Sequence, residues 1–460
     1  MPTAFLPTGA ARYRWYVLAV LTAVQTCHVL DRTIIMLIME PVRAEFHLTD
    51  GQLGLLAGLA YGIAYSVAAA PLGLLADRIS RRNLLAAALT IWSGLTALAG
   101  FAQNYSTLLL SRMAVGTAEA AGSSTQMSML SDYFPARERS TAVGLWYLSS
   151  AVGTTLTFLA GGYVAQHHGW RAAFFMAGIP GFLVAMLLLA TVREPQRGAS
   201  DESAAAPPPA MSAMQGLRYV ASRRGVLHCM AGIIVVSITM TSFAAWIASF
   251  LQREHGLPLA QAGVIAAIAF GVFGAIGGSV SGAFVDWRTR RSGGVYRPAR
   301  SARMSMITVL VSAVIGVAAL LVHATPLAVG LVFAYGLCFM AHNGPANSLL
   351  LSLVGPQVRG FTVSSLQIGT NLIGSGMGPF VVGAVSDRVG SLGTAMALAL
   401  LLNLWAAWHF WRASRHAAAD LQRLQEGHQF PPEVSLCRGS RLADSRLACL
   451  VQAVFHTRGR

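Results

Sequence analysis

Twelve separate stretches of the chain are long and apolar enough to cross a lipid bilayer as helices, and this repetition restricts the fold more than any other feature. A spanning helix needs about 20 mostly apolar residues. Hydrophobic residues make up 55% of the 460 residues and charged residues only 11%, too few to cover several water-soluble domains. We therefore expect an all-α membrane protein. The predicted spans are 15–39, 51–76, 84–102, 107–131, 141–166, 172–192, 225–252, 261–285, 303–323, 327–354, 361–386 and 391–411.

The arginines of the connecting segments divide unevenly between the two sides of the membrane. Before the C-terminal tail, alternate connections place nineteen Arg on one side and four on the other. Cytoplasmic loops carry the excess of positive charge, so the side with nineteen is predicted to be cytoplasmic. Because the number of spans is even, both termini are expected on that side.

One polar interruption is longer than the others and divides the spans into six and six. Residues 193–224 include the run AAAPPPA at Ala204–Ala210, a composition that favours a flexible, extended linker. The tail is expected to begin as a short helix through Gln425, and no function is assigned to it. The predicted organisation is a cytoplasmic N-terminus (1–14), a six-helix bundle (15–192), the cytoplasmic linker (193–224), a second bundle (225–411) and a cytoplasmic tail (412–460).

The two halves share a short motif at the end of their second span. Each copy reads GxxxD followed by a pair of arginines at the same offset, which indicates an internally duplicated transporter architecture. The first copy contains Gly73, Asp77, Arg78, Arg81 and Arg82; the second contains Gly282, Asp286, Arg290 and Arg291.

The loop from Gly73 to Arg82 resembles the signature loop of the major facilitator superfamily, with Ser80 in place of the usual glycine before the paired arginines. Helix number and linker position extend this resemblance over residues 15–411. Further stretches resemble the bacterial spinster-like branch: Leu30-Asp31-Arg32, Arg112 to Glu119, Asp132 to Arg139, Gly169-Trp170-Arg171, and Asn371 to Asp387.

Two observations bear on the branch of the superfamily. Organic-anion/cation symporters share the motifs of the first and fourth helices. The antiporter motif that many drug exporters carry in their fifth helix is not matched, because Gly153, Gly161 and Gly162 lack the adjoining Gly-Pro pair. This departure disfavours drug efflux.

The resemblance implies a fold of two pseudo-symmetric six-helix halves in a bacterial inner membrane, working by alternating access. The expected partners are the lipid bilayer and a small-molecule substrate, either an amphipathic lipid-like solute or an organic anion. No cofactor is expected beyond a proton gradient, no nucleic acid is expected to bind, and the protein is expected to act as a monomer.

Four charged side chains lie inside predicted spans, and each costs roughly 2.5–3.5 kcal/mol near the membrane centre if it is unpaired. They are Asp31 and Arg32 in the first span and Arg112 and Glu119 in the fourth. Arg112 and Glu119 are seven residues apart and share a helix face. Asp31 is expected at a depth between them, so the sequence predicts that Asp31 reaches Arg112, with Arg32 and Glu119 completing a neutral cluster.

This cluster has two interpretations. It is either a static ion-pair staple between two helices, or a site at which Asp31 and Glu119 exchange a proton with Arg32 and Arg112 as charge partners. Burial favours the neutral acid and a nearby arginine favours the anion, so changing their separation changes proton binding. The family resemblance supports proton coupling. His28 and His342 are expected mainly to pack, although His28 shares a face with Asp31 and could relay a proton.

The duplicated motif is predicted to form a cytoplasmic gate. The resemblance implies that Asp77 holds the outward-facing state by pairing with the eleventh helix, which begins near Gly360. The alternative is that these arginines only set the topology. The gate residues are Gly73, Asp77, Arg78, Arg81, Arg82, Asp286, Arg290 and Arg291.

Polar residues of the second half are candidates for the substrate cavity, although such side chains often form only interhelical hydrogen bonds. Pro345 is expected to interrupt the tenth helix between two of them. The candidates are Thr239, Ser242, Trp246, Asn343, Asn347, Gln367 and Asn371.

Two other classes compete with a coupled transporter: an uncoupled facilitator, in which the four charges are structural, and a membrane sensor with a transporter fold. A sensor would need a signalling domain, which neither the linker nor the tail resembles. No nucleophile–base pattern or phosphate loop predicts an enzyme, and the five Cys lack metal-site spacing.

Overall fold

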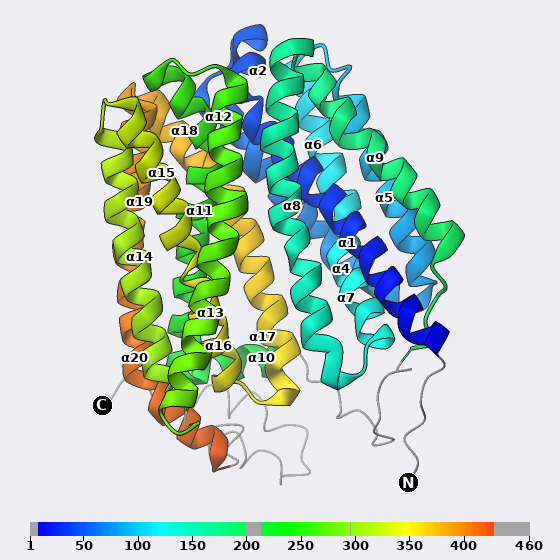
Figure 1. Ribbon diagram of the computed structural model, residues 1–460, viewed down its shortest axis with the longest axis vertical. Helices are drawn as coiled ribbons and strands as arrows, with labels where there is room; N and C mark the ends of the chain where they lie inside the picture. Colours follow the sequence, from blue (N-terminus) through cyan, green and yellow to red (C-terminus); the bar gives the residue numbers. More distant parts are fainter. Residues whose placement is uncertain (1–7, 198–212, 295, 427–460) are drawn as a thin grey trace, which may run out of the picture.

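The computed structural model of the chain describes residues 8–197, 213–294 and 296–426, and every regular element in these ranges is helical (Figure 1). Each of the twelve predicted spans coincides with one helix or with consecutive helical segments. The elements are α1 (Thr8–Leu37), α2 (Met39–Phe46), α3 (Asp50–Gly54), η1 (Leu55–Leu59), α4 (Ala60–Arg78), α5 (Arg81–Ala99), α6 (Tyr105–Glu119), α7 (Gly122–Tyr133), α8 (Ala136–His168), α9 (Trp170–Thr191), α10 (Ala213–Ser222), α11 (Arg224–His255), α12 (Leu259–Ala266), η2 (Ala267–Phe273), α13 (Gly274–Arg291), α14 (Pro298–Leu321), α15 (Thr325–Met340), α16 (Asn343–Leu353), α17 (Pro356–Gly369), η3 (Thr370–Met377), α18 (Gly378–Val389), α19 (Leu392–Leu400) and α20 (Leu402–Gln425).

Ten helical segments of the described chain are long and apolar enough to span a membrane by these two criteria alone. The two other predicted spans are α5, which has 19 residues, and the pair α6–α7, which breaks after Glu119. The pair carries Arg112 and Glu119, and these charges lower its hydropathy.

Both described ends of the chain lie at one face of the molecule, which we call the termini face; α2 lies at the opposite face (Figure 1). The halves pack against each other toward the opposite face. Segments α3 and η1 contact α18 and η3, while α8 contacts α12 and η2. Glycines permit this close approach of the backbones. A Cβ atom added to Gly58 would lie 2.5 Å from the carbonyl oxygen of Gly376, and a Cβ atom added to Gly263 would lie 2.3 Å from the carbonyl oxygen of Phe158.

The same helix pairs separate toward the termini face. Gly73 of α4 and Gly360 of α17 have no atom within 4 Å of an added Cβ, and the same holds for Gly144 of α8 and Gly282 of α13. The contacts between the halves are therefore concentrated toward the opposite face, while α17 at the termini face packs on α10, α11 and η3 of its own half.

Helical irregularities occur at matching places in the two halves. The π-helical segments η1, η2 and η3 all lie where the halves meet, and such segments are frequent at functional sites. The fourth and tenth spans both break near their middle, after Glu119 and at Ala341-His342. The second break agrees with the expectation for Pro345, whose ring would clash with the carbonyl of Ala341.

The linker contains more structure than its composition predicts. Residues 213–222 form α10, whose Tyr219 is buried and whose Gly216 packs on Phe361 of α17. The hydroxyl of Tyr219 also accepts a hydrogen bond from the Gly355 amide at 3.3 Å. The AAAPPPA run, the first seven residues and the tail beyond Glu426 lie outside the described residues.

Candidate functional site

Polar residues on α1 and on α6–α7 meet in register across the first bundle. Helix α1 carries Gln25, His28 and Asp31 three residues apart, so all three fall on one face. The fourth span carries Arg112, Glu119 and Gln126 seven apart, again on one face. The two series pair level by level. The carboxamides of Gln25 and Gln126 hydrogen-bond at 3.0 Å, His28 Nε2 lies 3.1 Å from Glu119 Oε2, and Arg112 Nη1 donates to the Asp31 carbonyl oxygen at 3.1 Å.

Glu119 is the centre of this ladder. Its side chain is completely buried, and Oε2 accepts a hydrogen bond from the Tyr61 hydroxyl at 2.5 Å in addition to its contact with His28. The other carboxylate oxygen, Oε1, is buried and has no hydrogen-bond partner among the described residues. Glu119 is also the last residue of α6, next to the break in the fourth span. The carboxylate therefore lies between two groups that can each donate or accept a proton.

The predicted ion pair between the side chains of Asp31 and Arg112 is not formed. Arg112 reaches the backbone, donating to the carbonyl oxygens of Asp31 and Arg32 at 3.1 and 3.4 Å. Both carboxylate oxygens of Asp31 are buried, and no hydrogen bond of ordinary geometry reaches them from the described residues, although the side chain of Trp92 lies near enough to interact with the carboxylate.

Arg32 connects the first half to the second. Its guanidinium lies over the ring of Tyr61, with 5.1 Å from Cζ to the centroid, and Nη2 donates to Asn371 Oδ1 of η3 at 3.4 Å. No ion pair with a carboxylate of the described residues involves Arg32, which is half-buried. It is therefore a cation at the boundary of the halves that has not been neutralised.

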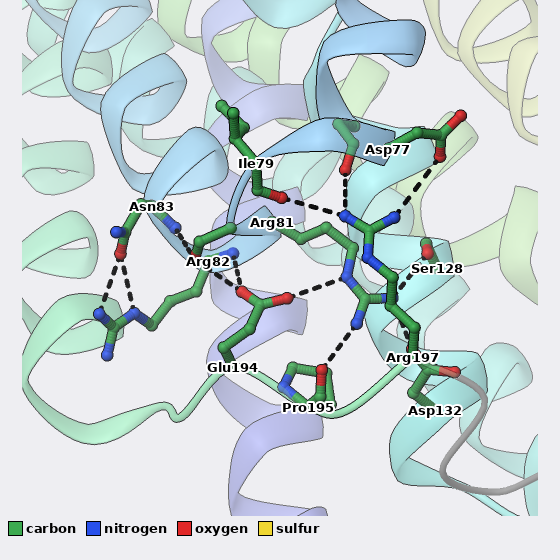
Figure 2. Close-up of polar contacts among 12 residues, drawn as sticks. Asp77, Ile79, Arg81, Arg82, Asn83, Ser128, Asp132, Glu194, Pro195 and Arg197 are labelled. Atoms are coloured by element: carbon green, nitrogen blue, oxygen red, sulfur yellow. Dashed lines mark hydrogen bonds and ion pairs between the residues drawn. The ribbon is translucent and has the colours of Figure 1, made fainter.

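At the termini face, the signature loop forms a network inside the first half (Figure 2). Arg81, which is buried, forms ion pairs with Asp132 at the end of α7 and with Glu194 after α9, and it donates to Ser128 at 2.9 Å. Glu194 also accepts hydrogen bonds from the Arg82 amide and the Ser80 hydroxyl. Desolvation opposes the charged form of Glu194, but these hydrogen bonds outweigh it and hold its pKa below the ordinary value.

The remaining gate residues of the first half do not contact the second half in this conformation. The Asp77 carboxylate is largely exposed and faces Arg197 at 3.8 Å, and Arg197 also donates to the Ala76 carbonyl oxygen (Figure 2). Gly73 faces open space. The expected pairing of Asp77 with the eleventh span is therefore absent while the termini face is open.

The second copy of the motif does not form the same network. Asp286, Arg290 and Arg291 are exposed on the last turns of α13, and Asp286 makes no ion pair with another described residue. Arg291 instead lies over the ring of Trp287 at 5.2 Å. The physical reason is the lack of acids, because residues 343–360 contain no counterpart of Asp132.

At the opposite face, a charged cluster that the sequence did not predict joins the two halves. Arg253 at the end of α11 donates to both oxygens of Asp50 at 2.8 Å and to Glu40 at 2.9 Å. The carboxylate of Asp387 in turn accepts the backbone amides of Asp50 and Gly51 at 2.8 Å, so it caps the first turn of the second span from the other half. We call Glu40, Asp50, Arg253 and Asp387 the opposite-face lock.

A sequence signal for this lock existed. Arg253 and Arg388 are two of only four loop arginines on this side of the membrane. Asp50 directly follows Thr49, which forms the N-cap of α3. The signal was weak because neither the capping pattern nor an isolated Arg at a helix end identifies a distant partner.

Three candidate cavity residues on α11 are structural instead. Thr239 donates to Asn403 Oδ1 at 2.7 Å, and Trp246 Nε1 donates to the Pro379 carbonyl oxygen at 3.0 Å. Ser242, like the other two, is buried, and it bonds the Ile238 carbonyl of its own helix. In this conformation the polar atoms of Thr239 and Trp246 bond α20 and α18, and that of Ser242 bonds α11 itself, so all three are engaged in helix packing.

The other candidates lie nearer the opening. Asn347 and Gln367 are exposed, and Asn347 Nδ2 donates to the Asn343 side chain at 3.2 Å. Asn371 is buried beneath Arg32. His342 is sealed inside the second half, where its Nδ1 contacts the Phe339 carbonyl oxygen at 2.6 Å. The geometry thus agrees with a packing role for His342 but not for His28.

A family model described as the Major Facilitator Superfamily matches residues 21–379. The chain belongs to the Major Facilitator Superfamily. Membership confirms the predicted fold, with its twelve spans, and the prediction that the protein is a membrane transporter and not an enzyme.

Individual relatives include spinster proteins, which belong to the predicted branch, and also an efflux pump, a class that the missing antiporter motif disfavoured. An MFS-type efflux pump of Mycolicibacterium smegmatis is 28% identical over 420 residues, 89% of this chain and 95% of that protein. Protein spinster of Drosophila melanogaster is 26% identical over 401 residues, 84% of this chain but 65% of the fly protein. The crystal structure of a bacterial homologue of the human lysosomal transporter spinster, inward-facing and unoccupied, has a TM-score of 0.77 and 26% identity, covering 89% of this chain and 98% of that one.

Proposed function

We propose that the protein is a proton-coupled secondary transporter that moves an amphipathic organic anion by alternating access. The observation that carries this proposal is the pair of buried carboxylates beside an arginine that forms no direct ion pair with the described residues. Asp31 is completely buried and also forms no ion pair with the described residues, Glu119 contacts His28 and Tyr61, and Arg32 donates to Asn371.

The charges suggest how the coupling works. With both carboxylates ionised, they balance Arg32 and Arg112, and an anion gains little by entering. Protonation of either carboxylate leaves one positive charge in excess, in a region where an unpaired charge costs roughly 2.5–3.5 kcal/mol. An anionic substrate at Arg32 restores neutrality. Proton and substrate then stabilise the same state, which is the condition for symport.

Two further proposals concern the direction of opening. The Arg distribution of the loops supports a cytoplasmic termini face, so the conformation described above would be inward-facing, as in the spinster homologue of the comparison. The signature loop at that face would be the cytoplasmic gate, and the opposite-face lock would be the gate on the other side. Asn343, Asn347 and Gln367 remain candidates for substrate contact near the opening.

Export is a second candidate direction, favoured by the likeness to the mycobacterial efflux pump. Export driven by a proton gradient requires antiport, in which substrate and proton compete. Symport and antiport predict opposite responses to an imposed gradient, so the same experiment separates them.

The test is uptake into proteoliposomes with and without an imposed pH gradient. The panel contains lysophospholipids, a sugar acid and a neutral sugar of similar size. The expected result is accumulation of an anionic amphipath when the substrate-side solution is more acidic. Asp31→Asn and Glu119→Gln should lose accumulation but retain exchange of labelled substrate. If both variants concentrate the substrate as wild type does, the carboxylates are a structural staple. Transport indifferent to pH in every variant would favour an uncoupled facilitator.

A further inference from the structure

A cluster of nitrogen-bearing side chains lies between α11 and α20 near the termini face, away from the site described above. His228 of α11 and His409 of α20 meet with 2.9 Å between their Nδ1 atoms. His416, two turns further along α20, stacks on His228 with 6.1 Å between ring centroids. Arg412 lies between the two α20 histidines and, with Arg224, close enough to His228 to act on it electrostatically. We call His228, His409, Arg412 and His416 the basic cluster.

The basic cluster has buried nitrogen atoms that the protein does not satisfy: the Arg412 Nε donor and a ring nitrogen of His416, which donates in one of its two tautomers. Arg412 Nε and His416 Nε2 are buried without a hydrogen-bond partner among the described residues. The nearby acid, Asp420, is already engaged: its Oδ2 accepts the Gly225 amide at 2.6 Å, and its Oδ1 lies 3.9 Å from Arg423. Buried donors without acceptors cost free energy, so an external anion that supplies acceptors would stabilise the cluster.

A metal ion does not fit the same residues. The Nδ1 atoms of His228 and His409 lie within hydrogen-bond distance of each other at 2.9 Å, and each nitrogen is used in that contact. Among the described residues, no group of three His, Cys, Asp or Glu side chains is arranged to hold a metal.

The surroundings place the cluster at the depth of lipid headgroups. Three tryptophans of α20 are exposed, Trp405 by 51%, Trp408 by 46% and Trp411 by 42%. They lie in the last turns of the predicted span 391–411, and exposed Trp residues toward the end of a span mark the membrane–water interface. The guanidinium of Arg412 lies 6.0 Å from the ring centroid of Trp408, at the edge of this aromatic band. A ligand reaching the cluster from this side comes from the membrane.

We propose that the basic cluster binds the phosphate of an anionic phospholipid, seated between α11 and α20 at the termini face. Basic pockets between transmembrane helices are suited to such headgroups. The acyl chains would lie along the exposed tryptophans, and the phosphate oxygens would accept from Arg412 and His416. Since α20 packs on both α11 and α14, an occupied site would stabilise the second half.

Native mass spectrometry of the purified full chain tests this site, with phosphatidylglycerol and phosphatidylcholine of matched acyl chains as probes. Wild type should retain phosphatidylglycerol in preference to phosphatidylcholine. Arg412→Gln should weaken phosphatidylglycerol binding about fivefold, which corresponds to ~1 kcal/mol, the contribution of one cation near a membrane surface. The matched control is Arg300→Gln, which removes an exposed cation from the same face and should leave binding unchanged.

His416→Gln provides a second variant in case Arg412→Gln fails to fold, and it should weaken binding in the same direction. The proposal is overturned if phosphatidylglycerol binds Arg412→Gln and His416→Gln as tightly as wild type. It is also overturned if Arg300→Gln loses as much binding, since the attraction would then be a general charge effect. Thermal stabilisation by inorganic phosphate equal to that by phosphatidylglycerol would assign the site to a free anion.

Discussion

Replacing Arg253 with Gln removes the cation that joins the two halves at the opposite-face lock. Arg253 is 19% exposed and Asp50 6%. Removing one member of a fully buried pair costs 3–5 kcal/mol, whereas an exposed pair contributes under about 1 kcal/mol. Because the pair is partly buried, we expect Arg253→Gln to destabilise the closed arrangement of the opposite face by about 2 kcal/mol. This free energy corresponds to a change of about thirtyfold in the equilibrium between the closed and open arrangements. The backbone contacts of Asp387 remain, so the effect should be a shift in population and not unfolding.

Pulsed electron–electron resonance between two spin labels measures this shift. Gln103 in the first half and Val389 in the second are exposed at the opposite face and can carry the labels, once the five native cysteines are replaced. Wild type should give mainly a short distance, and Arg253→Gln should add a longer population. Arg171→Gln is the matched control, because Arg171 pairs with Glu45 inside the first half at the same face. An unchanged distribution for Arg253→Gln would refute the role of the lock.

Three further substitutions test individual contacts. Tyr61→Phe removes the donor that orients Glu119 and should lower gradient-driven accumulation several-fold while exchange stays within about twofold of wild type, as compared in proteoliposomes. Thr239→Val should lower the free energy of unfolding by about 1 kcal/mol, because Asn403 Oδ1 loses its hydrogen-bond donor, and it should leave the apparent substrate affinity unchanged. A loss of affinity would indicate that Thr239 lines the substrate cavity. Glu194→Gln should destabilise the protein at neutral pH, and the difference in melting temperature from wild type should disappear on acidification. Because the pKa of Glu194 is held below its ordinary value of 4.5, its contribution is complete above that pH and is lost as pH falls through the lowered value.

The sequence predicted the spans well, because hydropathy and length alone decide which segments can cross a bilayer. It also placed Asp31, Arg112 and Glu119 on facing helices, since seven-residue spacing fixes a shared face. It did not predict which atoms would meet. Arg112 meets the carbonyl oxygen of Asp31 and not its carboxylate, and residue spacing carries no information about which of the two it reaches.

Contacts between distant segments were the other omission. The lock depends on Asp50 and Arg253, which are 203 residues apart in the sequence and belong to different halves. Asn403 lies in the last span and accepts the hydrogen bond of the Thr239 hydroxyl. The sequence pattern of α11 alone had suggested that this hydroxyl faces the substrate cavity. Such pairings depend on how whole bundles dock, which the pattern within one helix does not determine.

The central claim is that Glu119 carries the coupled proton, and substrate-driven proton movement tests it most directly. Proteoliposomes that enclose a pH-sensitive dye are given the transported anion with no imposed gradient and with the membrane potential clamped. Wild type should acidify the interior as substrate enters, and Glu119→Gln should take up substrate to equilibrium with no change in internal pH. Equal acidification by Glu119→Gln and wild type would contradict the account.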